Sequence, residues 1–432
     1  MKYRTIIFLS LVGLLFACKP EIDEFKASAG SADFSNYISV GNSLTAGYAD
    51  GALYHSAQAN SYPSILAQQF KTVGGGEFVQ PVVESEYGVL PGKLVLDFST
   101  NCLGDPSLGP VPASGQAEGY SPVGYSVNNL GVPGAKTFHL LAPGYGNPAG
   151  VPVGLANPYY ARFASAADAS VIGDAAAHEA SFFSLWIGNN DVLGYATSGG
   201  IGDTITGQQP FAGYMNAILG TLTANGAKGV IANLPGITGA AFFNVIPYNG
   251  LVLTDTNQVN GLNAAYAPLG ITFNLGQNPF IIADPNAPAG LRQITENEMV
   301  LLTTPGDSLR CAGWGSIKPI PDQYTLSETE IANINSAIEG YNATIKTLAD
   351  TYNLAFVDIN SYFGQVESGV TYDGESFSVT YVTGGTFSLD GIHLTQKGYA
   401  LIANQFITAI NGKYGANIPK VSVTDYPGIE FP

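Results

Sequence analysis

The stretch Tyr37-Ile38-Ser39-Val40-Gly41-Asn42-Ser43-Leu44 decides the fold that we expect. Its first four residues form a short, mostly apolar run of the kind found in buried strands. A serine follows three positions later, and the flexible Thr45-Ala46-Gly47 comes after it. Open α/β sheets present ligands and reactive groups at the carboxyl ends of their strands. The stretch therefore predicts an α/β protein with Ser43 at the edge of its sheet.

Strands and helices alternate along the rest of the chain. Further strands are predicted at residues 124–128, 182–187, 229–234 and 354–359, and helices at 62–70, 211–222, 294–302 and 395–410. Ser327 and Glu330 form a capping box that opens a long helix with apolar residues at helical spacing up to position 348. This alternation predicts a five-stranded parallel sheet with helices on both faces.

Two segments, residues 72–120 and 236–326, interrupt this alternation. The first is rich in glycine, proline and serine, and the second is rich in aromatic residues. Long insertions in compact domains are often functional. Two interpretations of the second segment stay open, a packed insertion with its own small core or a lid or wall that shapes a substrate pocket.

Near the other end of the chain, Asp390-Gly391-Ile392-His393 places a carboxylate and an imidazole three positions apart. A serine hydroxyl is a weak nucleophile until a base takes its proton, and that base needs a group to orient it. Three residues on one turn bring both side chains together. Asp390 can then hold the Nδ1–H of His393 while Nε2 faces Ser43.

Two further motifs follow predicted strands. Residues 129–135 read Asn-Leu-Gly-Val-Pro-Gly-Ala, and residues 188–191 read Gly-Asn-Asn-Asp. Acyl transfer needs hydrogen-bond donors aimed at the oxygen that becomes negative in the tetrahedral intermediate. The backbone N–H groups of Gly134 and Ser43 and the side-chain amide of Asn190 are three candidate donors.

These four motifs together resemble the SGNH hydrolases, also called the GDSL esterase/lipase family. The matching blocks are Gly41 to Leu44, Asn129 to Gly134, Gly188-x-Asn190-Asp191 and Asp390-x-x-His393. The resemblance implies a flavodoxin-like three-layer α/β/α fold. It also implies that Ser43 is the nucleophile, His393 the general base and acid and Asp390 its orienting residue, with Gly134 and Asn190 in the oxyanion hole. One departure is Asn42, where the family's name motif has aspartate.

The expected function is serine-dependent hydrolysis of carboxylic esters through an acyl-enzyme, with no cofactor. The substrate class is a small ester, a lipid or an acylated carbohydrate. Two alternatives stay open: a non-catalytic lipoprotein that binds glycans or lipids at the surface, and an acyltransferase that uses the same residues.

The first residues predict export. Lys2 and Arg4 precede an apolar stretch at 6–16 that is too short to span a bilayer and suits a signal peptide. Leu15-Phe16-Ala17-Cys18 resembles a lipobox, so we expect residues 1–17 to be removed and Cys18 to carry acyl chains. Residues 18–33 would then be a tether and 34–432 a single domain, anchored to a bacterial membrane and expected at the outer membrane.

Charge and cysteine content exclude other classes of function. The net charge of −17 repels phosphate backbones, so nucleic acid is not an expected partner. The four histidines, His55, His139, His178 and His393, lack zinc-type spacing, and no metal site is expected. Cys102 and Cys311 could form a disulfide in an oxidising compartment or remain two buried thiols.

Overall fold

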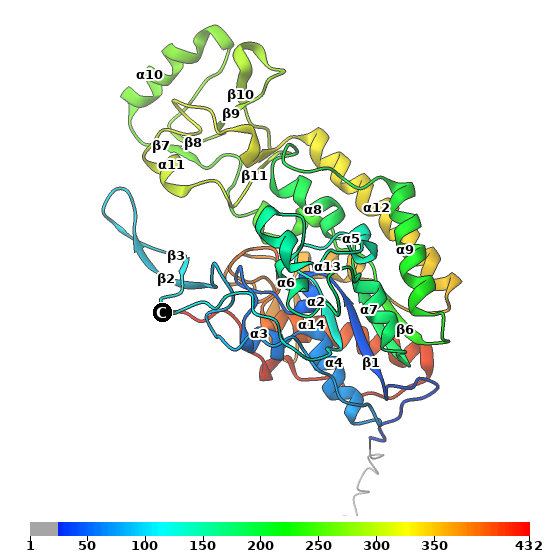
Figure 1. Ribbon diagram of the computed structural model, residues 1–432. Helices are drawn as coiled ribbons and strands as arrows, with labels where there is room; N and C mark the ends of the chain where they lie inside the picture. The colour runs from blue at the N-terminus through cyan, green and yellow to red at the C-terminus, as the bar shows by residue number, and fades with distance from the viewer. Residues whose placement is uncertain (1–24) are drawn as a thin grey trace, which may run out of the picture.

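The computed structural model describes residues 25–432, shown in Figure 1. The predicted signal peptide, Cys18 and the start of the predicted tether lie outside this range. No helix in residues 25–432 combines the length and the apolar character needed to cross a membrane. The central sheet has five parallel strands: β1 (Tyr37–Gly41), β4 (Asn129–Gly131), β5 (Phe182–Trp186), β6 (Lys228–Ala232) and β13 (Ala355–Val357).

The strands lie side by side in the order β13-β6-β5-β1-β4. This is the flavodoxin-like order, in which the chain reverses direction across the sheet between β1 and β5. Every residue of β1 and β5 is buried, as expected for parallel strands with helices on both faces. The point of reversal lies between the carboxyl ends of these two strands, where a doubly wound sheet binds its ligands.

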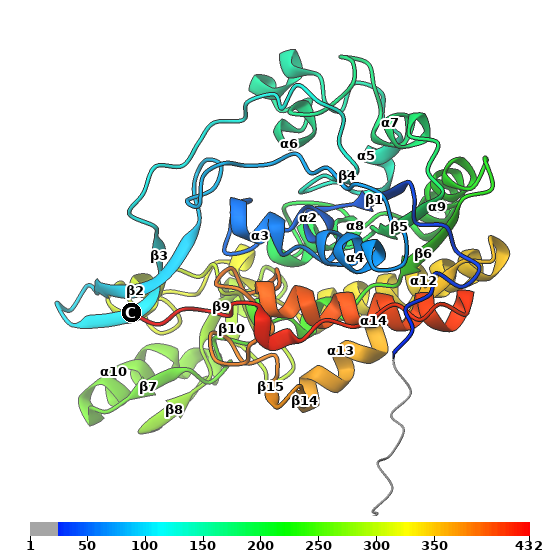
Figure 2. The ribbon, with the colours of Figure 1, turned by 90° about the horizontal axis from the view of Figure 1, so that it is seen from below.

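Helices cover the sheet in two layers (Figure 2). On one face, α4 (Tyr62–Lys71) contacts α14 (Gln396–Tyr414). On the other, α9 (Gln208–Leu222) contacts both α7 (Val171–Ala177) and α12 (Glu328–Thr351). The predicted capping box is confirmed, because the Ser327 hydroxyl accepts from Glu330 N–H and the Glu330 carboxylate accepts from Ser327 N–H. The three-layer α/β/α fold is therefore confirmed.

Shorter elements lie around these layers. They are α2 (Ser43–Ala46), α3 (His55–Ala59), α5 (Thr137–Leu141), α6 (Pro158–Ala161), α8 (Asn190–Thr197), α13 (Ile359–Ser368), β14 (Val370–Tyr372) and β15 (Glu375–Phe377).

The predicted strand at residues 124–128 is wrong. Pairing with β1 begins only at Asn129, which lies opposite Ser39. Residues 124–128 run along the edge of the domain instead: Gly124 has a φ of +73°, and the Tyr125 side chain is 46% exposed. Tyr125 and Val127 alternate with small or polar residues as in a strand, but the segment lies largely at the surface. The strand β4 follows directly after it.

One predicted helix and one predicted strand boundary are also wrong. The helix expected at 294–302 is absent, and Met299–Val300 form the short strand β11 opposite β12 (Thr325–Leu326). The Glu298 carboxylate accepts from the Thr295 N–H and from Arg292, which favours a turn over a helix here. The last sheet strand ends at Val357, because the Asp358 side chain accepts from Ser361 N–H and caps α13.

Both predicted insertions have a structure of their own. In the first, β2 (Leu94–Thr100) and β3 (Pro106–Pro112) form an antiparallel hairpin that projects from the domain (Figures 1 and 2). The second contains helices and short strands packed around two small apolar clusters. Its elements are β7 (Leu251–Leu253), α10 (Thr256–Tyr266), β8 (Gly276–Asn278), β9 (Ile281–Ala283), β10 (Leu291–Gln293), β11, α11 (Gly306–Arg310) and β12.

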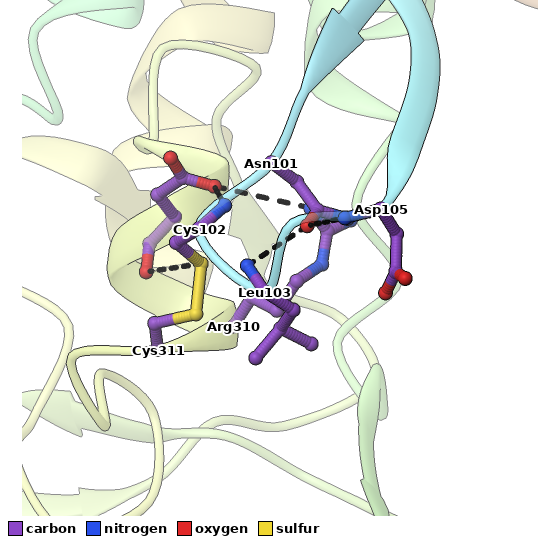
Figure 3. The surroundings of a disulfide bond; sticks show 7 residues. Asn101, Cys102, Leu103, Asp105, Arg310 and Cys311 are labelled. Atoms are coloured by element: carbon purple, nitrogen blue, oxygen red, sulfur yellow. Dashed lines mark hydrogen bonds and ion pairs between the residues drawn. A yellow bond between two sulfur atoms is a disulfide. The ribbon is translucent and has the colours of Figure 1, made fainter.

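A disulfide joins the two insertions (Figure 3). Cys102, at the turn of the hairpin, is bonded to Cys311, at the end of α11, and the two are 209 positions apart in sequence. The Cys102 N–H also donates to Asp307 Oδ1 at 3.3 Å. Of the two states that the sequence left open for these cysteines, the structure has the disulfide.

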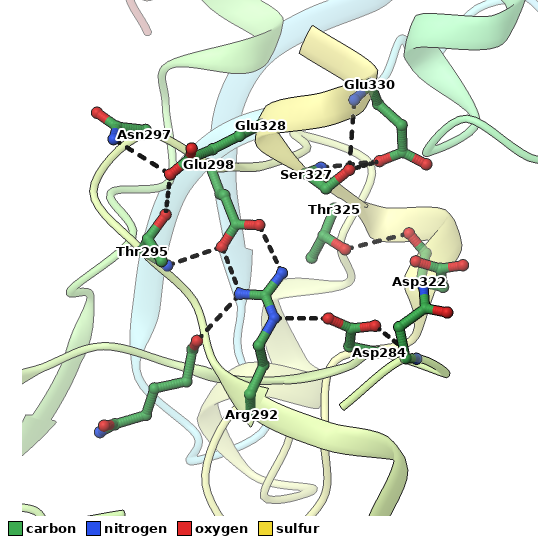
Figure 4. Close-up of polar contacts among 12 residues, drawn as sticks. Asp284, Arg292, Thr295, Asn297, Glu298, Asp322, Thr325, Ser327, Glu328 and Glu330 are labelled. Atoms are coloured by element: carbon green, nitrogen blue, oxygen red, sulfur yellow. Dashed lines mark hydrogen bonds and ion pairs between the residues drawn. The ribbon is translucent and has the colours of Figure 1, made fainter. Parts of the chain in front are cut away.

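Polar contacts fix the second insertion to the start of α12 (Figure 4). Arg292 donates to both oxygens of Glu298 at 2.6 Å, and its Nε donates to Asp284 at 2.6 Å. The Glu298 side chain is only 3% exposed, so this carboxylate depends on Arg292 for its charge partner. Thr295 and Asn297 donate to Glu328 in the first turn of α12.

The predicted tether is partly folded onto the domain. Ser28 exchanges backbone hydrogen bonds with Asn417, and Ser31 N–H donates to the Tyr414 carbonyl. Phe34 is buried in the main core, where its ring stacks on that of Phe70 at 4.1 Å. Any free tether therefore ends before Ser28, which is earlier than the boundary at residue 33 that the sequence suggested.

Candidate active site

Ser43 lies just past the carboxyl end of β1 and is the first residue of α2. Its residue exposure is 7%, so the hydroxyl is largely shielded from bulk water. Asn42 caps this short helix, since its Oδ1 accepts from Leu44 N–H at 3.1 Å. The buried strand and the cap together fix the serine at the end of the sheet.

Asn42 also connects the two strand ends at the point of reversal. Its Nδ2 donates to Asn189 Oδ1 at 3.2 Å, from the end of β1 to the turn after β5. Asn42 is 1% exposed and carries no charge into this buried position. The departure from the family's aspartate therefore leaves the cap intact and supplies a donor to Asn189.

His393 stands between Ser43 and Asp390. Its Nε2 lies 2.8 Å from Ser43 Oγ, and its Nδ1 lies 2.9 Å from Asp390 Oδ2. With a proton on Nδ1, the imidazole accepts the hydroxyl proton at Nε2 and donates to the carboxylate. The structure thus brings together three residues from opposite ends of the chain in the order that the sequence motifs predict.

The Asp390 carboxylate accepts four hydrogen bonds. Besides the imidazole, it accepts from the N–H groups of Ile392 and His393 at Oδ1 and from Gly51 N–H at Oδ2. Burial by itself would raise the pKa of Asp390, but the nearby His393 and these hydrogen bonds outweigh it and hold the pKa well below its usual range. Asp390 is therefore ionised at neutral pH and suited to orient and stabilise the imidazole.

The loop Tyr48-Ala49-Asp50-Gly51 supports the Asp390 loop, and sequence reasoning missed it. Asp50 accepts from Leu389 N–H at 3.0 Å, and Asp50 N–H donates to Ser388 Oγ at 2.9 Å. Burial raises the pKa of the Asp50 carboxyl, against hydrogen bonds from Leu389 and Tyr54 that lower it. The only indication in the sequence is that Asp50 lies seven positions after Ser43, because no sequence pattern connects Asp50 to position 389.

Tyr48 lies against the catalytic imidazole. The centroids of the Tyr48 and His393 rings are 4.6 Å apart, with 48° between their planes. The Tyr48 hydroxyl donates to the Gly51 carbonyl, and burial raises its pKa to about 12. Tyr48 therefore stays neutral and restricts the rotation of the His393 ring by contact.

Asn190 begins α8, directly after β5 and its turn. One hydrogen of its Nδ2 is used in a 2.9 Å bond to the Ala135 carbonyl, and the amide has a second N–H. Gly134, which has a φ of +80°, is the residue just before Ala135. The bond to Ala135 thus joins the two turns that were predicted to supply oxyanion donors.

Asp191 also connects the turn after β5 to the segment that follows β4. It is fully buried and accepts from the Thr137 N–H at 2.8 Å and from its hydroxyl at 2.7 Å. Burial raises the pKa of Asp191, while the two bonds from Thr137 oppose that rise. Its role in the Gly-x-Asn-Asp block is to position Asn190 on the turn after β4.

An apolar pocket of about 50 Å³ opens beside Ser43. Ser43, His393 and Asn190 lie on its wall, whereas Gly134 is not among its lining residues. Gly236, Ile237 and Ala240, at the start of the second insertion, form another side. Each of the two interpretations of that insertion therefore holds for part of it. Its first residues form a wall of the pocket, and the remainder packs around its own apolar clusters.

A family model described as GDSL-like Lipase/Acylhydrolase matches residues 37–406. No curated protein gives a significant match.

Solved structures with a similar fold come from several bacteria. A putative GDSL-like lipase from Parabacteroides merdae has 11% identity and a TM-score of 0.37, over 89% of this chain and 99% of the other. An acetylxylan esterase from Geobacillus stearothermophilus has 12% identity and a TM-score of 0.36, over 88% and 96%. A lipase/acylhydrolase from Enterococcus faecalis has 12% identity and a TM-score of 0.34, over 87% and 95%. Such low values say nothing about the substrate of this chain.

Proposed function

The chain belongs to the GDSL-like lipase/acylhydrolase family and is a carboxylic ester hydrolase, and from this premise we propose that it acts through an acyl-enzyme on Ser43. The observation that carries the proposal is the position of His393, within hydrogen-bond distance of Ser43 Oγ on one side and of Asp390 on the other. A nucleophile, its base and a group that orients the base are the parts that covalent acyl transfer requires.

In the first step, His393 Nε2 takes the Ser43 proton as Oγ attacks the carbonyl carbon of the ester. The carbonyl oxygen becomes negative and accepts hydrogen bonds from the free N–H of the Asn190 amide and from the backbone N–H groups of Ser43 and Gly134. When the tetrahedral intermediate collapses, His393 gives its proton to the alcohol oxygen. The alcohol leaves, and the acyl group stays on Ser43.

In the second step, water takes the place of the alcohol. His393 removes a proton from the water as its oxygen attacks the acyl carbon, and a second oxyanion forms at the same donors. Collapse returns the proton to Ser43 Oγ and releases the acid. Asp390 stays ionised throughout, because its four hydrogen bonds stabilise the carboxylate.

Hydrolysis of p-nitrophenyl acetate by purified variants tests this mechanism. Ser43→Ala should lower kcat by at least about 10³-fold, as expected when one member of a catalytic triad is removed. Ser99→Ala, on the exposed hairpin, is the matched control and should keep the wild-type rate. A Ser43→Ala rate within tenfold of the wild type would show that another group attacks the ester.

The same proposal includes export and lipid anchoring through Cys18. The lipobox-like Leu15-Phe16-Ala17-Cys18 after a short apolar stretch supports it. The Cys102–Cys311 disulfide also supports it, since disulfides persist mainly in oxidising compartments outside the cytoplasm.

The N-terminal segment joins the domain far from the active site. The N-terminal segment reaches the sheet at Tyr37, the amino end of β1, whereas Ser43 follows its carboxyl end. The point where the N-terminal segment joins the sheet and the active site therefore lie at opposite ends of the sheet.

Metabolic labelling with an alkyne analogue of palmitate tests the anchor. The wild type should incorporate the label and sediment with membranes, and Cys18→Ala should lose the label and appear in soluble fractions. Label that persists in Cys18→Ala would overturn the assignment of the lipidated residue.

A further inference from the structure

The pocket beside Ser43 is almost entirely apolar away from its mouth. Its polar groups, Ser43, His393 and three asparagines, gather at the end nearest the nucleophile. Most of the remaining wall is aliphatic or aromatic and includes Leu193, Ile237, Phe363, Phe387, Ile392 and Leu394. A hydroxyl-rich group placed here would lose its hydrogen bonds to water without replacement, which is costly. The pocket therefore suits the hydrocarbon part of an ester better than a sugar.

Two phenylalanines form part of the apolar wall. Phe363 on α13 and Phe387 before the Asp390 loop have ring centroids 5.9 Å apart, and their residue exposures are 6% and 5%. The backbone of Phe387 is also paired with that of Leu394 on the far side of the loop, which fixes the chain on both sides of Asp390 and His393. Both rings are therefore fixed parts of the wall.

The second insertion packs against the Asp390 loop next to this pocket. Phe242 N–H donates to the Gly391 carbonyl at 2.9 Å, and Leu302 N–H donates to the Phe242 carbonyl at 3.0 Å. A Cβ on Gly391 would lie 2.9 Å from Phe242 N and 3.0 Å from the Leu302 side chain. This close packing leaves the Asp390 loop no room to move back and lengthen the pocket.

The volume sets the size of the group that fits. An apolar cavity of about 150 Å³ is large enough to bind benzene. The cavity beside Ser43, at about 50 Å³, therefore suits a much smaller group, such as a carbonyl carbon with a short chain.

We propose that this pocket binds the acyl group and that the enzyme is specific for short-chain acyl esters, from acetyl to butanoyl. The assignment rests on the proposed acyl-enzyme at Ser43 and names the substrate class of that site. The alcohol must leave on the side of His393 that opens to solvent, because the imidazole gives it a proton. Its size is then limited far less than that of the acyl chain.

A series of p-nitrophenyl esters from acetate to decanoate tests the proposal, with kcat/KM as the readout below the micelle concentration of each ester. Each added CH₂ up to butanoate should raise kcat/KM by up to about fourfold as it is buried. Between butanoate and decanoate kcat/KM should fall at least about tenfold, because longer chains overfill the cavity.

Variants on the wall should move this profile in opposite directions. Phe363→Ala should shift the optimum to hexanoate or longer, and Phe363→Leu should do so in a smaller step if the alanine variant fails to fold. Leu193→Trp, at a half-buried position, should narrow the pocket and lower the butanoate-to-acetate ratio at least fivefold. Phe98→Ala, on the exposed hairpin, is the control and should keep the wild-type profile.

Two results would overturn the short-chain proposal. One is a Ser43-dependent wild-type activity that is highest on octanoate or longer. The other is a short-chain profile that neither the Phe363 variants nor Leu193→Trp change. Absence of Ser43-dependent hydrolysis at every chain length would instead refute the proposed function, so the two failures are distinguishable.

Discussion

Replacing Asn190 with alanine tests the oxyanion hole and separates a catalytic role from a structural one. One N–H of the Asn190 amide is used to bind the Ala135 carbonyl, and we propose that the other donates to the oxyanion. Loss of one such donor typically lowers kcat by roughly 10²–10³-fold and leaves ground-state binding nearly intact. Loss of the bond to Ala135 should lower the free energy of unfolding by only about 0.5–1.5 kcal/mol. The protein therefore stays folded while the rate falls.

The assay measures kcat and KM on p-nitrophenyl butanoate together with the melting temperature. Asn411→Ala is the matched control, because Asn411 exchanges two hydrogen bonds with Ile418 at the far end of α14. It should lose at least as much stability as Asn190→Ala and keep the wild-type kcat. Asn190→Asp should be at least as slow as Asn190→Ala, since its charge repels both the oxyanion and the Ala135 carbonyl. A kcat of Asn190→Ala within a few-fold of the wild type would refute the role of Asn190 as a donor.

Three further changes probe the supporting contacts. Asp390→Asn should lower kcat by up to about 10⁴-fold, because an amide favours the wrong imidazole tautomer. The lowered pKa of Asp390 stabilises the folded state fully above about pH 4, and this stabilisation is lost as the pH falls further. The difference in melting temperature between the wild type and Asp390→Asn should therefore narrow in acid. A difference that stays constant with pH would contradict this. Replacing both Cys102 and Cys311 with serine should lower the free energy of unfolding by up to about 5 kcal/mol. It should also speed hydrogen exchange of the backbone amides across residues 94–112. Unchanged exchange there would show that the disulfide does not hold the hairpin in place. Arg292→Met leaves the buried Glu298 carboxylate without its partner and should cost about 3–5 kcal/mol in chemical denaturation, whereas a wild-type unfolding curve would show that Glu298 does not need the charge.

The sequence predicted the parts of the fold that bury long apolar runs. The strands around Ser39, Ser184 and Val230 lie where their apolar residues indicated, because strands covered on both faces need continuous apolar side chains. The strand at Asn129–Gly131 is short and has two small or polar residues, so it lacks that signal. The segment before it, in which Tyr125 and Val127 alternate with small or polar residues, has the stronger strand pattern even though Tyr125 is exposed.

The residues of the site also fall into those that the sequence predicted and those that it did not. Ser43, Asp390, His393 and Asn190 follow strands or stand at fixed spacing, so their motifs can be recognised along the chain. Asp50 and Tyr48 act through contacts with residues about 340 positions away, and no local pattern encodes such contacts. The pocket wall depends in the same way on residues of the insertion and of α13 that meet only in the folded chain.

Covalent labelling of the nucleophile tests the central claim most directly. The intact mass of the protein should rise by one adduct after treatment with a fluorophosphonate, and peptide mapping should place that adduct on Ser43. Ser43→Ala should show no adduct under the same conditions, and His393→Ala should react far more slowly because its serine has no base. An adduct on another residue, or an unlabelled wild type that still hydrolyses esters, would contradict the assignment of Ser43 as the nucleophile.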